Sequence, residues 1–238
     1  MSLWREEFST VQDSIYRVRA QMQEAAIRSG RDPKEITLLA ATKTVPPEVI
    51  NCAIEAGVDR IGENRVQELL SKIDQVDRKN TPVDLIGHLQ TNKVSKVLPH
   101  VSMIHSVDSY RLAEAISVQS QKFGKITDIL VEVNIGQEEC KSGIAAQELL
   151  PLLDQISQLP HICVKGLMTI PPICEKIDET RKYFSNMYQL FLDIKSKNID
   201  NIDMQHLSMG MSADFAQAIE FGSTMVRVGS VLFGKRNV

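Results

Sequence analysis

Lys43 is the first residue of the chain whose type and position could do chemistry. It follows an apolar run at residues 38–42 (LLAAT), which predicts a short buried strand, and it precedes Pro46 and Pro47, which end that strand and can open a helix. A lysine in this position is rarely fully buried unless it is paired or reactive. Its neutral amine, which desolvation favours, would form a Schiff base with an aldehyde. A solvated lysine at a strand end is the alternative that Lys43 alone leaves open.

Two later segments have the composition of a phosphate site. Ser208, Gly210 and Ser212 precede a predicted helix, and Gly229 and Ser230 follow the last predicted strand. Hydroxyl groups and backbone N–H groups at the start of a helix bind an anion well. A plain helix cap at Ser212 explains the first segment about as well, because serine is a common N-cap. An anion cradle is favoured if the two segments meet at one place.

The elements that must position these residues alternate along the chain between strands and helices or turns. The hydrophobic pattern predicts eight strands, at residues 36–42, 58–61, 83–87, 101–105, 128–135, 162–170, 203–208 and 224–228. Strict alternation implies parallel strands with helical crossovers. Eight such units in one domain over residues 1–238 predict an α/β fold, a single (β/α)8 TIM barrel with an extra N-terminal helix at 3–29. An open doubly wound sheet is the competing architecture, although no Gly-x-Gly-x-x-Gly follows the first strand.

A barrel would bring the chemical residues to one mouth, because the carboxyl ends of all its strands meet there. An amine beside an anion cradle suits a phosphorylated aldehyde, and pyridoxal phosphate, which a lysine usually anchors, is such a molecule. Arg227 lies near the end of the last strand and points toward the same space, and if it faces the pyridine nitrogen it can only donate to it. That nitrogen would then stay unprotonated, which limits carbanion chemistry. An ion pair at the barrel rim is the alternative for Arg227.

Composition excludes several other classes of protein. The 238 residues are 43% hydrophobic and 24% charged, as in ordinary globular proteins, and a net charge of -3 argues against a nucleic-acid partner. We find no signal peptide, no apolar segment that could span a bilayer, and no zinc-type cysteine spacing. We therefore expect a cytoplasmic monomer without a metal site, in which the cysteines are free thiols: Cys52, Cys140, Cys163 and Cys174.

Seven motifs together resemble the pyridoxal phosphate homeostasis protein family, in the right order and over nearly the whole chain. They are ATKTVP at 41–46, GENRVQE at 62–68, IGHLQTNK at 86–93, KSGI at 141–144, GLM at 166–168, LSMGMSAD at 207–214 and RVGSVLFG at 227–234. Each motif is weak alone, and the set is highly specific. One departure is the order Thr44-Val45-Pro46 after the lysine, where members often carry a bulky residue followed directly by proline.

The resemblance implies a barrel like the N-terminal domain of alanine racemase, with pyridoxal phosphate as its cofactor. It implies that Lys43 forms the Schiff base and that Arg227 faces the pyridine nitrogen. It also implies phosphate contacts from Ser208, Gly229 and Ser230, with Asn64 and Met209 lining the cofactor. Members supply and buffer the cofactor within the cell, so apo-enzymes that depend on it are expected recipients. No catalytic turnover is expected.

A racemase or decarboxylase of fold type III, using the same cofactor, is the main alternative. Alanine racemase-like enzymes add a β-rich domain that supplies an opposing tyrosine, because acid–base work on both faces of a substrate needs a second group. This sequence ends a few residues after the last predicted barrel segment, and its four tyrosines fall on predicted helices away from the mouth: Tyr16, Tyr110, Tyr183 and Tyr188. A Schiff-base aldolase without any cofactor is a third alternative.

Two residues of the predicted mouth keep open roles. His88 is either a structural histidine in the core or at a helix end, or a rim residue that contacts a ligand. Lys141 lies in a polar loop, where it is either a solvated lysine or a second amine that accepts the aldehyde during transfer.

Overall fold

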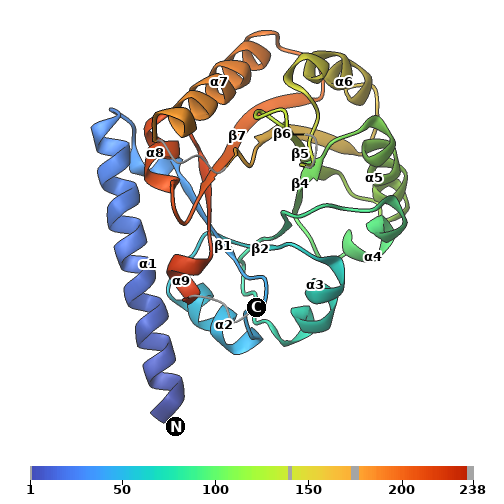
Figure 1. The fold of residues 1–238 in the computed structure, drawn as a ribbon. Helices are drawn as coiled ribbons and strands as arrows, with labels where there is room; N and C mark the ends of the chain where they lie inside the picture. The colour runs from blue at the N-terminus through green and yellow to red at the C-terminus, as the bar shows by residue number, and fades with distance from the viewer. Residues whose placement is uncertain (1, 139–140, 173–176, 235–238) are drawn as a thin grey trace.

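The strands form a closed barrel in chain order, in which each pairs in parallel with the next and β8 pairs with β1 (Figure 1). The structure is a computed structural model that describes residues 2–138, 141–172 and 177–234. The closed order of eight parallel strands confirms the predicted (β/α)8 barrel. The strands are β1 Thr37–Ala41, β2 Arg60–Glu63, β3 Val83–Leu85, β4 Met103–Val107, β5 Thr127–Glu132, β6 Ile162–Met168, β7 Ile202–Met211 and β8 Met225–Val228.

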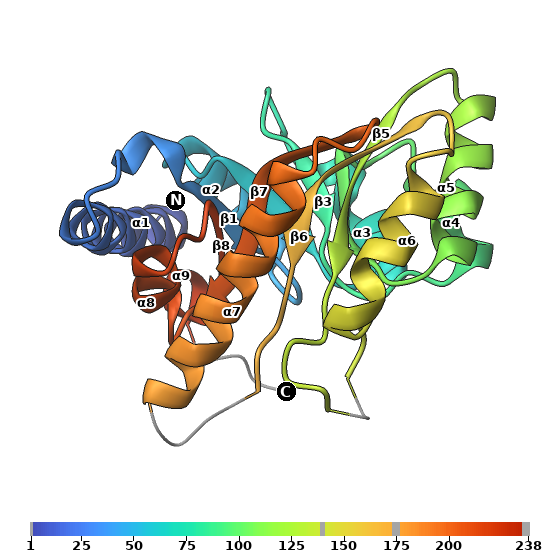
Figure 2. The same cartoon turned by 90° about the horizontal axis from the view of Figure 1, so that it is seen from above.

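Helices surround the barrel and cover the outer faces of the strands (Figures 1 and 2). The α-helices are α1 Ser2–Arg28, α2 Pro47–Glu55, α3 Val66–Lys72, α4 Val94–Val97, α5 Tyr110–Lys122, α6 Leu149–Ile156, α7 Ile177–Ser196, α8 Phe215–Glu220 and α9 Ser230–Phe233. Four single 3-10 turns accompany them at Pro33–Glu35, Ile73–Gln75, Thr91–Lys93 and Ala146–Glu148. The sequence pattern predicts continuous helices at 64–76, 92–98 and 146–158, and the structure splits each of them into an α-helical and a 3-10 part.

The long helix α1 closes the side of the barrel where the short helix α9 leaves β8 uncovered. It packs against α2, α8 and α9 (Figure 1). Five of its apolar residues recur every three or four positions, which places them on one stripe. These five are buried: Val11, Ile15, Val18, Met22 and Ala25. Burial of each larger apolar side chain contributes about 1.5–3 kcal/mol. No helix of the described part of the chain is long and apolar enough to cross a membrane.

Strand β7 is longer than the sequence predicts, and this moves two predicted site residues. The expected end was residue 208, whereas β7 continues to Met211 with a register shift between Ser208 and Met211 against β8. The shift occurs around Gly210, whose φ is +93° and where a Cβ atom would lie 2.5 Å from the Cβ of Ala218. Only glycine satisfies both conditions. Ser208 and Met209 therefore lie within the barrel, and Ser212 is the first residue beyond the strand.

Candidate functional site

A cavity of about 700 Å³ opens where the carboxyl ends of β1, β2 and β8 lie beside the end of β7. Its lining residues are Ala41, Lys43, Asn64, Ile86, Ile170, Met211, Ser212, Ala213, Arg227, Gly229 and Ser230. The first and last strands bring the two ends of the sequence together here, because β1 and β8 pair to close the barrel. Five of the seven predicted site residues line this one cavity: Lys43, Asn64, Arg227, Gly229 and Ser230.

The backbone on both sides of Lys43 is held by a buried lysine of α3. The ammonium of Lys72, which is 8% exposed, donates to the carbonyl oxygens of Thr42 at 2.8 Å and Val45 at 3.3 Å. The same Nζ forms ion pairs with Glu63 at 2.7 Å and Glu68 at 3.1 Å. Burial raises the pKa of Glu63, against the opposing effect of the Lys72 hydrogen bond. Lys43 is itself half-buried on the cavity wall, so a fixed backbone directs its side chain.

Asn64 is held in the wall by the close approach of Gly87. A Cβ atom at position 87 would lie 2.2 Å from the carbonyl oxygen of Asn64, so no other residue fits there. Ser106 of β4 donates to the carbonyl of Gly87 at 2.7 Å and fixes the loop from the other side. The loops after β2 and β3 therefore pack backbone to backbone beneath this part of the mouth.

Arg227 supplies a buried positive charge to the cavity. It is 4% exposed and donates from Nη1 to Ser208 Oγ at 2.6 Å and from Nη2 to the carbonyl of Thr169 at 2.9 Å. Burial lowers the pKa of Arg227 to about 10, although the nearby carboxylates of Glu132 and Asp214 act to raise it. The guanidinium is therefore charged at neutral pH. Two of its five N–H groups have acceptors among the described residues. The side chain thus retains donors for a ligand.

A chain of hydrogen bonds crosses the barrel interior and ends at Arg227. Because Arg227 can only donate, Ser208 Oγ accepts from it and can direct its own hydrogen to His105 Nδ1, 3.5 Å away. His105 Nε2 then carries the ring proton and donates to Asp84 Oδ2 at 3.1 Å. Burial lowers the pKa of His105, more than the carboxylate of Asp84 raises it, so the ring is neutral. This arrangement fixes the tautomer of His105 and the orientation of the Ser208 hydroxyl.

The far end of this chain is an ion pair within the barrel. Asp84, which is 0% exposed, accepts from Arg60 Nε and Nη2, both at 2.6 Å. Burial alone would raise the pKa of Asp84, but the hydrogen bonds from Arg60 and His105 outweigh it and hold that pKa below its usual range. The carboxylate is therefore ionised at neutral pH and anchors the chain that orients Arg227.

The loop after β7 meets the loop after β8 through the hydroxyl of Ser212. Its Oγ accepts from the backbone N–H groups of Gly229 at 3.1 Å and Val231 at 3.4 Å. Met211 N donates to Asp214 Oδ1 at 2.6 Å, which fixes the turn that presents Ser212. Ser212 and Ser230 thus line the same cavity as Gly229, whose backbone N–H donates to the Ser212 hydroxyl. The predicted meeting of the two glycine–serine segments is confirmed.

Ser208 and Met209 do not line this cavity. Both are 0% exposed: Ser208 contacts Arg227 from below, and Met209 packs in the main apolar core. Both residues lie further inside the strand than the sequence predicts, because β7 continues to Met211. Lining residues that the site prediction lacked fall in two groups. Ser212 belongs to a segment that the sequence predicts as a phosphate site, although the resemblance implies only Ser208 from that segment. The apolar lining residues carry no chemical signal in the sequence: Ala41, Ile86, Ile170, Met211 and Ala213.

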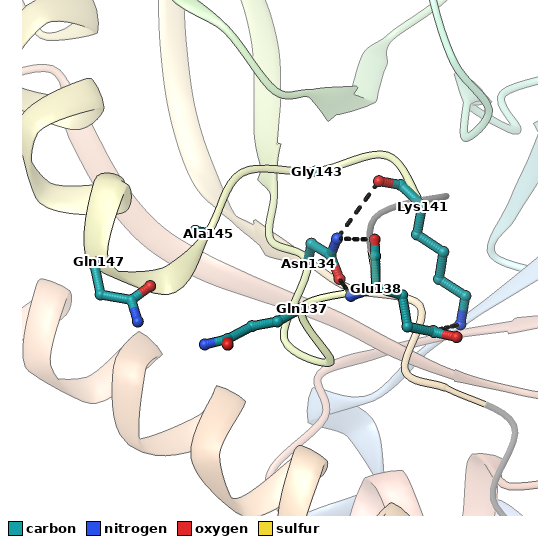
Figure 3. Close-up of a pocket in the computed structure, with 7 residues that line it drawn as sticks. All are labelled: Asn134, Gln137, Glu138, Lys141, Gly143, Ala145 and Gln147. Carbon is teal, nitrogen blue, oxygen red and sulfur yellow. Dashed lines mark hydrogen bonds and ion pairs between the residues drawn. The ribbon is translucent and has the colours of Figure 1, made fainter.

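Lys141 lines a different cavity, of about 390 Å³, beside the start of α6 (Figure 3). Its ammonium forms an ion pair with Glu138 and donates to the carbonyl of Pro171 at 3.2 Å. Asn134 donates to the Glu138 carbonyl at 2.8 Å and to the Lys141 carbonyl at 3.4 Å, which closes the loop around the lysine. Residues 139–140, with Cys140, lie outside the described residues, as does Cys174. Lys141 and Lys43 thus line separate cavities.

Glu132 at the end of β5 gives a testable pH dependence. Burial, reinforced by the charge of Asp108, raises its pKa from 4.5 to about 7. A carboxyl whose folded pKa is raised contributes stability that is full below pH 4.5 and is lost as the pH rises to about 7. Glutamine does not titrate, so we expect Glu132→Gln to lack this pH-dependent loss of stability. The loss amounts to up to about 3 kcal/mol, at about 1.4 kcal/mol per pKa unit.

Urea unfolding of both proteins between pH 4.5 and 8 measures this difference. Burial also lowers the pKa of His206, to about 4, so this histidine makes stability rise with pH. Both proteins contain His206, so its contribution cancels when their profiles are compared. Glu114→Gln on the exposed face of α5 is the matched control and should leave the profile unchanged. Parallel profiles for wild type and Glu132→Gln would contradict the expectation.

Comparison with known proteins assigns the chain to a family. A family model described as alanine racemase, N-terminal domain, matches residues 20–237. The pyridoxal phosphate homeostasis protein of Aquifex aeolicus is 42% identical over 224 residues, which cover 94% of this chain and 97% of that protein. The chain belongs to the pyridoxal phosphate homeostasis protein family. The Escherichia coli K12 member is 37% identical over 227 residues, covering 94% of this chain and 96% of that member.

Solved structures agree with this membership of the pyridoxal phosphate homeostasis protein family. PipY of Synechococcus elongatus PCC7942, solved with PLP bound, has a TM-score of 0.82 and 31% identity, and the match covers 94% of this chain and 100% of PipY. An alanine racemase of Clostridium difficile 630 has a TM-score of 0.71 at 16% identity, covering 92% of this chain and 60% of the racemase. The second likeness shows the shared barrel fold alone.

Proposed function

We propose that this protein binds pyridoxal phosphate at the barrel mouth, and that it carries and buffers the cofactor inside the cell. The observation that supports this best is the content of one cavity, in which Lys43, Arg227 and the Ser212–Gly229 contact lie together. PipY, a structural relative solved with PLP bound, makes that cofactor the most reasonable ligand for such a donor set. Pyridoxal phosphate would supply an electrophilic aldehyde carbon, with which a lysine amine can condense with loss of water, and a pyridine ring that can withdraw electrons.

The residues of the cavity fit the functional groups of this cofactor. The Lys43 amine would hold the aldehyde as a Schiff base, on a backbone fixed by Lys72. Ser212, Gly229 and Ser230 would hold the phosphate, in place of the Ser208 contact that the resemblance implies. Arg227 would donate to the ring nitrogen and keep it unprotonated, and Asn64 would line the ring edge.

We propose further that the protein does not turn over amino acids. Acid–base chemistry on both faces of an amino acid needs a second positioned group besides the lysine. The four tyrosines lie on α1, α5 and α7, and none is among the described residues that line the cavity. An unprotonated ring nitrogen beside Arg227 would also weaken carbanion stabilisation. A cytoplasmic carrier that releases its cofactor to apo-enzymes is consistent with these features.

Borohydride reduction followed by peptide mapping tests the binding proposal. Purified protein is incubated with pyridoxal phosphate, reduced, digested and analysed by mass spectrometry. We expect the reduced adduct on the peptide that contains Lys43. An adduct found only on Lys141 or on another lysine would refute the proposed site. Incubation of the loaded protein with L-alanine, followed by chiral chromatography, tests turnover, and sustained racemisation would favour the racemase alternative.

A further inference from the structure

A second, smaller cavity shares Asn64 with the proposed cofactor cavity. It measures about 250 Å³, and its lining residues are Asn64, Arg65, Val66, Gln67, His88, Gln90 and Lys93. These residues come from the loop after β2 with the start of α3, and from the loop after β3 with the following 3-10 turn. The close packing of Gly87 on the Asn64 carbonyl sets the two loops against each other. The two cavities are therefore neighbours at the barrel mouth, with one residue in common.

The lining of this second cavity consists of hydrogen-bond donors without an opposing carboxylate. Arg65 and Lys93 are cations, and His88 and the amides of Gln67 and Gln90 can also donate. No aspartate or glutamate is among its described lining residues. Across the described chain, none of these five side chains has a hydrogen bond or ion pair. Their donors are therefore available to a ligand.

Two other cavities of the described structure, one beside α6 and one beside α8, differ in this respect. Lys141, in the cavity beside α6, is paired with Glu138. Arg28, in the cavity beside α8, contacts Glu220 at 2.8 Å, and Arg181 in the same cavity contacts Asp178 at 3.3 Å. An uncompensated set of cations in a concave site attracts an anion, because the walls focus the field. The cavity beside Asn64 has this property.

We propose that Arg65, His88 and Lys93 form a binding site for a small anion that carries a carboxylate or a phosphate group. Arginine and lysine are the side chains that most often bind these groups, arginine through paired N–H donors. The volume lies below the roughly 300–1,000 Å³ of cavities that hold drug-sized ligands, so a small metabolite is the fitting occupant. The site itself is independent of the proposed function.

Calorimetric titration of the full-length protein with malonate and, separately, with inorganic phosphate tests the site. The protein is first loaded with pyridoxal phosphate and reduced, so that the cofactor cavity is filled and does not compete for the anion. We expect saturable binding of at least one probe, and the probe that binds identifies the chemistry of the natural ligand. Binding of neither probe would overturn the proposal.

Paired variants show where the anion binds. Arg65→Gln combined with Lys93→Gln should weaken binding at least tenfold, and His88→Gln alone should weaken it by a smaller factor. The charge-matched control combines Lys96→Gln and Lys122→Gln, at exposed positions of α4 and α5 outside the cavity. An equal loss of binding in this control, or unchanged binding in the first pair, would overturn the proposal. Thermal unfolding of each variant confirms that it is folded.

The same titration on Lys43→Ala separates this inference from the proposed function. That variant is titrated without cofactor, with and without the Arg65→Gln and Lys93→Gln substitutions. The part of its anion binding that these two substitutions remove should equal the part that they remove from the cofactor-free wild type. If the anion binds there but no reduced adduct forms on Lys43, the anion site stands and the cofactor proposal fails. If the adduct forms but the Arg65 and Lys93 variants bind anions normally, the anion site fails alone.

Discussion

Replacing Lys43 with alanine is expected to abolish covalent retention of pyridoxal phosphate and to weaken its binding by at least about 100-fold, or ~2.7 kcal/mol. The amine provides the only covalent link that we propose, and the remaining contacts are hydrogen bonds and charge interactions from Arg227, Ser212 and the Gly229–Ser230 loop. Gel filtration of loaded protein, followed by absorbance of the cofactor, measures how much stays bound. The folded structure should persist, because Lys43 is half-buried on a cavity wall rather than in the core.

Two controls separate the covalent role of Lys43 from its charge. Lys43→Arg keeps a cation at the position but cannot form a Schiff base, so it should lose retention almost as fully as the alanine variant. Lys141→Ala removes the lysine of the other cavity and should retain the cofactor as the wild type does. Retention by Lys43→Arg equal to that of wild type would show that charge alone binds the cofactor.

The barrel could be predicted because its signal is local and repeated. Eight apolar strands, each bounded by turn residues, give a pattern that one misjudged boundary does not destroy. The boundary that failed was that of β7, where Met209-Gly210-Met211 has the composition of a loop. Its glycine adopts a left-handed φ of +93° and keeps the chain in the sheet through a register shift. Nothing in the local sequence distinguishes this irregular strand from a turn.

The candidate site could be predicted as a set of loops but not as a set of contacts. Lys43, Arg227 and Gly229 lie within two residues of a strand end, and the fold brings strand ends together whatever their sequence. The interior chain from Arg60 to Arg227 depends on pairings between residues that are 19 to 103 positions apart. A single sequence does not specify such pairings. The available signal was a charged or polar residue inside an otherwise apolar strand, as in VDLI at 83–86 and MIHSV at 103–107.

The contact that holds the backbone around Lys43 could not be predicted for a similar reason. Lys72 occurs on a short helix four residues after Glu68, a spacing that usually indicates an exposed ion pair of small energy. In the structure its ammonium is buried and binds two carbonyls that flank Lys43. Tertiary packing thus changed an ordinary surface pattern into part of the site.

Replacing Asp84 with asparagine is expected to lower the free energy of unfolding by about 3–5 kcal/mol, because it leaves the Arg60 charge without its partner inside the barrel. Asp84 is 0% exposed and accepts all three of its hydrogen bonds from Arg60 and His105. An amide offers one oxygen in place of two, and its NH₂ group would face the Arg60 donors. Since domains are typically stable by only about 5–15 kcal/mol, urea denaturation should detect the loss readily.

The matched control for Asp84→Asn is Glu55→Gln, which removes the same charge from an exposed pair. Glu55 lies 3.6 Å from Lys79, and the two side chains are 53% and 52% exposed, so the expected cost is about 0–1 kcal/mol. The low pKa of Asp84 adds a test by pH: its stabilisation is present above the ordinary carboxyl pKa and is lost as the pH falls through the folded value. The gap between wild type and Asp84→Asn should therefore narrow in acid. A gap that is small at neutral pH, or that widens in acid, would mean that the Arg60–Asp84–His105 chain does not stabilise the barrel beneath Arg227.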